Sequence, residues 1–146
     1  MAKSSFQIKV EEMLLKYIIR FIRYSRFSHL PDDRRQILIG TFMYLLDEQD
    51  LIPDDVPNIG LLDDLAVFIY SAKFFIQGGQ GIPGVCSPEE VNEDFEFLEK
   101  NKGLLYGAHM PSVEVIQKKG KNVEVEIYEL GEKIKEKYSY LGKVEA

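Results

Sequence analysis

The feature that most constrains the fold is a polar interruption at residues 46–64, LDEQDLIPDDVPNIGLLDD, between two apolar stretches with helical spacing. Six aspartates, two prolines and one glycine occur in it. Proline disfavours helical backbone in the residue before it, so a helix that reaches Pro53 or Pro57 has to end. The segment is therefore predicted to be the turn of a helical hairpin, with helices ending near Leu46 and beginning near Leu61.

Four helices are predicted from apolar residues that recur at helical spacing. They cover about residues 6–27, 31–46, 61–77 and 87–101. The third is apolar on nearly every side and is expected to lie in the centre of the fold. The fourth opens with SPEE, which supplies the serine, the first-turn proline and the glutamate of a capping box.

The C-terminal part changes from helical to alternating periodicity. Apolar residues alternate at Val113 and Val115 and again at Val123, Val125 and Ile127, with the glycine-bearing KKGKN between them. This pattern predicts a β-hairpin, which needs a partner because two strands alone are marginally stable.

The predicted fold is a compact, mainly α, four-helix domain with a C-terminal hairpin, α+β overall. Residues 132–144 fit either a short helix or a third strand. The helical part is expected to cover residues 1–110, with residues 111–146 packed on it as one structural domain.

Composition excludes several classes of function. The formal net charge of -6 argues against general affinity for nucleic acid, since phosphate binding needs a positive field. One cysteine cannot form an intramolecular disulfide. No apolar run approaches the ~20 residues that cross a bilayer, and the first residues lack the apolar core of a secretory signal. A cytoplasmic protein is expected.

The interruption also carries a family resemblance. The run from about residue 34 to residue 75 resembles the core of the YkvA-like family, domain of unknown function 1232. An apolar helix there ends in an Asp-Leu-Ile-Pro-Asp turn, and a glycine and an Asp-Asp pair open the next helix. The matching positions are Asp50, Leu51, Ile52, Pro53, Asp54, Gly60, Asp63 and Asp64. The resemblance implies a small helical domain, found mainly in bacterial proteins, and implies no reaction.

Four aspartates of this motif are candidate site residues: Asp50, Asp54, Asp63 and Asp64. No cofactor is expected, and the alternative is a divalent cation, since carboxylates gathered in one turn can hold Mg²⁺ or Ca²⁺. Their spacing does not match a calcium-binding loop. The favoured interpretation is structural: Asp63 and Asp64 cap the third helix, and Asp50 and Asp54 accept hydrogen bonds from backbone amides or pair with arginines.

All five arginines fall within residues 20–35: Arg20, Arg23, Arg26, Arg34 and Arg35. They are candidates for binding an anion or an anionic membrane surface. The favoured alternative is a salt-bridge network with the aspartates of residues 46–64. His29, His109 and Cys86 lie in no catalytic or metal motif and are interpreted as structural residues.

The favoured function is a non-enzymatic module for protein interaction or self-association. The alternative is a metal-dependent or anion-binding protein that uses the aspartates and arginines. Peripheral membrane association is a weaker alternative. The sequence identifies no substrate, reaction or partner.

Overall fold

The computed structural model describes residues 4–27, 29–46, 61–77, 87–101, 113–121 and 126–142. These residues form six α-helices and contain no strand. The helices are α1 (Ser5–Ser25), α2 (Asp32–Leu46), α3 (Leu62–Phe75), α4 (Pro88–Lys100), α5 (Val113–Gly120) and α6 (Ile127–Lys137). A single 3-10 turn, η3 (Ser139–Leu141), follows α6. The four predicted helices are therefore present, with their ends within a few residues of the expected positions.

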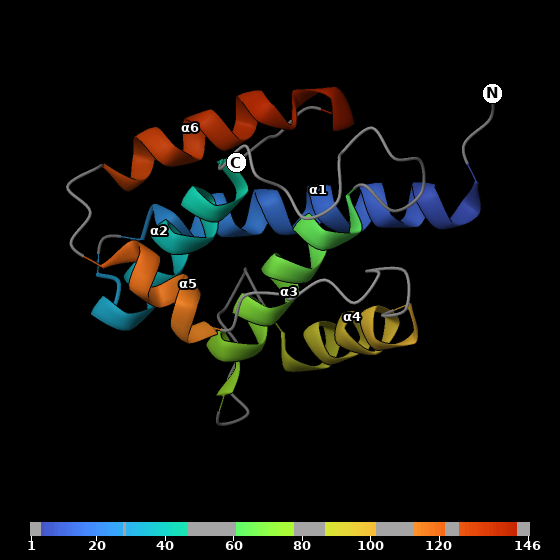
Figure 1. Cartoon of the computed structure of the whole chain (residues 1–146), viewed down its shortest axis with the longest axis horizontal. Helices are drawn as coiled ribbons and strands as arrows, with labels where there is room; N and C mark the ends of the chain where they lie inside the picture. The colour runs from blue at the N-terminus through green and yellow to red at the C-terminus, as the bar shows by residue number, and fades with distance from the viewer. Residues whose placement is uncertain are drawn as a thin grey trace.

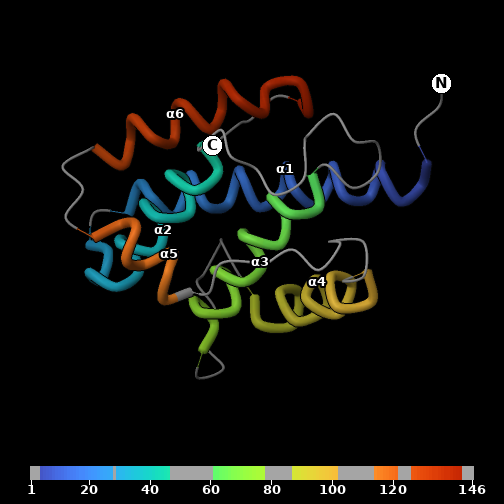
Figure 2. Tube along the Cα trace, in the orientation of Figure 1, coloured from blue at the N-terminus to red at the C-terminus, as the bar shows by residue number. Residues whose placement is uncertain are grey.

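The helices pack around α3, which crosses the molecule diagonally between α1 and α4 (Figure 1). The long helix α1 spans most of the molecule, and α6 runs alongside it, in contact with both α1 and α2 (Figure 2). The short helix α5 packs on α2. Helices from the beginning and the end of the chain thus enclose the hairpin formed by α2 and α3.

The third helix is buried as its sequence predicts. Every residue from Leu62 to Ile69 is buried. The ring of Phe68 meets Phe21 of α1 edge to face, with 4.9 Å between ring centroids. Thr41 of α2 and Ser71 of α3 are fully buried, and their hydroxyls share a hydrogen bond of 3.0 Å. Pairing them offsets the cost of burying each hydroxyl.

The predicted β-hairpin is wrong, because residues 113–120 form α5 and Ile127 is the first residue of α6. Ile116 and Gly120, one helical turn apart, are buried, whereas Val115 is 56% exposed. Alternation over so few residues fits both periodicities, and packing against α2 decides in favour of the helix. The described part of the chain is consequently all-α rather than α+β. Val123 and Val125 lie outside the described residues.

The tail adopts the helical alternative. Leu130, Ile134 and Tyr138 are buried at intervals of four residues, which places them on one side of α6. The Lys137 ammonium donates a hydrogen bond to the carbonyl of Leu45, in the last turn of α2. These side chains belong to the same core as those of α1 to α4. The division at residue 110 stays a prediction.

Two glycines bring α2 and α5 unusually close. A Cβ added at Gly40 would lie 1.8 Å from the carbonyl oxygen of Ile116. A Cβ added at Gly120 would lie 1.9 Å from the carbonyl oxygen of Gln36. The side chain of Gln117 reaches across the contact and donates to that of Gln36 at 2.9 Å. The absence of side chains at both glycines is what allows α5 to dock.

In the part of the chain that the structure describes, no helix has the length and apolar character needed to span a membrane.

Candidate functional site

The first polar cluster lies between α1 and α4. Lys16 binds Glu90 at 3.1 Å and Asp94 at 2.7 Å, and Arg20 binds Glu90 at 2.6 Å. The hydroxyl of Tyr17 donates to Asp94 at 2.7 Å. Two cations thus meet two carboxylates, and the cluster joins the two helices.

The arginines do not act as one group. Arg20 pairs with α4, Arg26 lies 3.8 Å from Glu132 of α6, and Arg23 is exposed near the end of α1. Arg34 donates to the hydroxyl of Tyr24 at 3.0 Å and to the carbonyl of Phe75 at 3.3 Å. These partners lie on four helices, so the arginines connect several parts of the fold. Whether any of them also meets residues 47–60 lies outside the described residues.

The hydrogen bond from Arg20 is the main cause that lowers the pKa of Glu90 from its usual 4.5. Burial opposes the shift and Lys16 adds to it. Because the pKa is lower in the folded protein, the ionised Glu90 stabilises the fold above about pH 4.5. This contribution is lost as the pH falls below 4.5 and through the pKa of the folded state.

We therefore expect Glu90→Gln to lower the free energy of unfolding by about 0–1 kcal/mol at neutral pH, as for other partly exposed ion pairs. The difference from the parent protein should shrink as the pH falls below 4.5 and through the pKa of Glu90 in the folded protein, where the carboxylate becomes protonated. Urea unfolding at a series of pH values measures both quantities. Glu89→Gln is the matched control, because Glu89 is exposed on the same turn. A difference between parent and Glu90→Gln that stays constant with pH would contradict this assignment.

Asp63 and Asp64 lie in the first turn of α3 and are 2% and 1% exposed. Asp63 accepts a hydrogen bond from the backbone amide of Asp64 at 2.9 Å. Asp64 accepts one from the hydroxyl of Tyr138 at 2.5 Å. Carboxylates are favourable at this end of a helix because of its dipole. Asp64 therefore joins the start of α3 to the end of α6.

The remaining aspartates of the predicted metal site, Asp50 and Asp54, lie outside the described residues, as do Cys86 and His109. Within the described ranges, no group of three or more His, Cys, Asp or Glu residues is placed to hold a metal ion.

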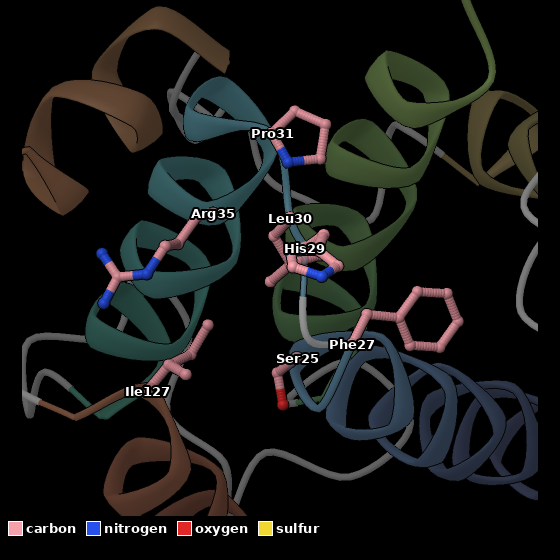
Figure 3. Close-up of a pocket in the computed structure, with 7 residues that line it drawn as sticks. All are labelled: Ser25, Phe27, His29, Leu30, Pro31, Arg35 and Ile127. Carbon is pink, nitrogen blue, oxygen red and sulfur yellow. The ribbon is translucent and has the colours of Figure 1, made fainter.

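A pocket lies at the corner where α1 ends, the chain turns into α2 and α6 begins. Its volume is about 460 Å³, and we call it the corner pocket. It is lined by Ser25, Phe27, His29, Leu30, Pro31, Arg35 and Ile127 (Figure 3). In this view Phe27 and Arg35 lie on opposite sides, with His29 and Leu30 between them.

The lining of the corner pocket is about equally polar and apolar, and we call its apolar side chains the apolar wall. Phe27, which is 46% exposed, shares the wall with the partly buried Leu30 and Ile127. The Ser25 hydroxyl donates to the carbonyl of Ile22 at 2.6 Å, so its proton is already used. The guanidinium of Arg35 has no hydrogen bond or ion pair within the described ranges. None of the seven lining residues is acidic.

Part of this arrangement could be read from the sequence and part could not. The arginine-rich window contains Arg35, and His29 was expected in the turn beside it. The contribution of Ile127 was missed because the residue was assigned to a strand. The helical spacing of Tyr138 from Ile134 could have predicted that Tyr138 is buried. Nothing in the sequence identifies Asp64 as its hydrogen-bond partner.

Residues 34–70 match the protein family described as "Protein of unknown function (DUF1232)". The family resemblance predicted from the aspartate-rich turn is thereby confirmed over these residues. No curated protein and no solved structure matches the chain.

Proposed function

We propose that this chain is a non-enzymatic interaction module that holds an apolar side chain of a partner protein in the corner pocket. The observation that carries the proposal is the solvent-open apolar wall formed by Phe27, Leu30 and Ile127. A volume of about 460 Å³ is in the range of ligand-binding pockets and is large enough for a leucine or phenylalanine side chain. Exposed aromatic and arginine side chains are also enriched at protein interfaces.

The chemistry of the pocket favours binding over catalysis. Ser25 and His29 both line it, but the serine proton is donated to a backbone carbonyl rather than to the imidazole. A serine nucleophile needs a neighbouring base that accepts its proton. The β-hairpin predicted from the sequence is absent from the described residues, so we place the interaction surface at the corner pocket.

A protein segment fits the surroundings of the pocket better than a lipid surface. Asp32 and Asp33 are exposed in the first turn of α2, next to Pro31. Arg26, on the preceding helix, lies 3.8 Å from the carboxylate of Glu132. Carboxylates spread among the arginines weaken attraction to anionic headgroups, which requires an excess of positive charge.

The proposal predicts that the neutral peptide acetyl-Gly-Leu-Asn-Gly-amide binds the full chain weakly. Its Leu side chain should shift amide resonances of residues 25–35 and 127–129 in a two-dimensional nitrogen–proton NMR titration. Phe27→Ser should raise the Kd at least about fivefold, because the variant removes apolar contact area. Ile8→Ser is the matched control: Ile8 is 44% exposed, near the opposite end of α1.

Three outcomes would contradict the proposal. Shifts that cluster elsewhere, or that survive Phe27→Ser, would show that the pocket is not the binding surface. Light scattering could find a dimer that Phe27→Ser dissociates and Ile8→Ser does not. The pocket would then bind a second copy of this chain rather than a different protein. Sedimentation with phosphatidylglycerol vesicles that depends on Phe27 would assign the surface to membranes instead.

A further inference from the structure

The corner pocket contains Arg35, whose guanidinium could bind a ligand. Arg34, its neighbour in sequence, uses its guanidinium within the fold, on Tyr24 and on the end of α3. Arg35 is exposed and makes no such contact within the described ranges. A guanidinium carries five N–H donors in a planar fork that matches a carboxylate.

None of the other lining groups repels a negative charge. No acidic residue lines the pocket, and the exposed His29 has a ring N–H donor. In Figure 3 Ile127 lies on the side of Arg35, and Leu30 and Phe27 lie across from it. A ligand that uses both features needs an apolar group and an anion a short distance apart.

We infer that the corner pocket recognises an aspartate or glutamate beside an apolar residue, within a continuous segment of a partner protein. This inference rests on the proposed function and specifies its ligand. The apolar side chain would contact Phe27, Leu30 and Ile127, and the neighbouring carboxylate would accept hydrogen bonds from Arg35. Because Phe27, His29, Pro31 and Arg35 are all exposed, the pocket is open enough for a chain to continue past it on both sides. An internal acidic residue is therefore favoured over a chain terminus.

Two peptides that differ in one group test the inference. Acetyl-Gly-Leu-Asp-Gly-amide carries the carboxylate, and acetyl-Gly-Leu-Asn-Gly-amide is its neutral counterpart of nearly the same shape. NMR titration of the full chain should give at least a fivefold lower Kd for the aspartate peptide at low ionic strength. Added salt should reduce the difference, since the new ion pair is partly exposed.

Variants separate recognition by Arg35 from the overall field of the protein. Arg35→Gln should bring the two peptides to the same Kd and leave binding of the neutral peptide unchanged. Lys100→Gln removes one exposed positive charge from the end of α4 and should preserve the preference. A Leu-to-Gly change in the aspartate peptide should weaken its binding, since the apolar contact is lost.

The outcomes distinguish this inference from the function on which it rests. Equal binding of both peptides at the corner pocket would overturn carboxylate recognition and leave the interaction module intact. A preference that survives Arg35→Gln would also overturn it, because the anion would then be bound elsewhere. Failure of both peptides to shift corner resonances would overturn both proposals.

Discussion

Replacing Gly40 by alanine is expected to destabilise the protein by about 1–3 kcal/mol or more, and Gly120→Ala is expected to do the same. The added methyl group would lie 1.8 Å or 1.9 Å from a backbone carbonyl oxygen of the facing helix. A backbone atom cannot rotate away as a side chain can, so α2 and α5 have to separate. This cost exceeds the roughly 1 kcal/mol that alanine gains over glycine within a helix.

Urea unfolding followed by circular dichroism measures the loss, and amide hydrogen exchange reports whether α5 detaches first. Gly131→Ala is the matched control, because it also changes a buried helical glycine. The nearest atom to its added Cβ is a side-chain carbon of Ile22, at an ordinary contact distance of 3.8 Å. Gly131→Ala should therefore be neutral or stabilising. Similar effects of all three substitutions would show that the α2–α5 contact is looser than described.

Removing the hydroxyl of Tyr138 is the second change with a large expected effect. Tyr138→Phe deletes the donor that lies 2.5 Å from Asp64, at a site where both residues are buried. A buried acceptor that loses a donor costs about 1–3 kcal/mol, and more if it is charged. We expect a loss of free energy of unfolding in this range, without a change in helix content at low denaturant.

A double-mutant cycle with Asp64→Asn tests whether this loss comes from the hydrogen bond itself. Tyr140→Phe controls for loss of a phenolic hydroxyl, since Tyr140 is 61% exposed two residues further along the chain. It should change stability by no more than about 0.5 kcal/mol. A coupling energy near zero between Tyr138 and Asp64 would rule out the proposed link between α3 and the tail.

The sequence predicted the helices where the pattern was long and failed where it was short. The apolar positions of α1 extend over several turns and fit one periodicity only, and the apolar run of α3 is long enough for a buried helix. Residues 113–120 offered too few apolar positions, and the decisive feature was the close approach of Gly40 and Gly120. A contact between glycines eighty residues apart has no signature in local periodicity.

The candidate site was predictable only in its chemistry. The arginine window indicated an anion-binding residue, but Arg20, Arg26 and Arg34 have partners inside the fold and Arg35 has none within the described ranges. This division depends on which side of each helix meets a neighbour. The apolar wall consists of Phe27 and Leu30, from the connection between α1 and α2, and of Ile127 at the start of α6. These residues lie together because α6 packs on α1 and α2.

The hydrogen bond between Asp64 and Tyr138 joins residues 74 positions apart in the sequence. Asp64 lies within the segment that matches the family, and Tyr138 lies outside it. Residues 34–70 provide all of α2 except its first two residues and about two thirds of α3, and the apolar sides of these helices are covered by α1, α4, α5 and α6. A fragment cut at those boundaries would expose these apolar sides to water. It would also lack Tyr138, the hydrogen-bond donor to Asp64. The unit by which such chains are recognised is thus smaller than the unit that folds, and expression boundaries should be drawn around the latter.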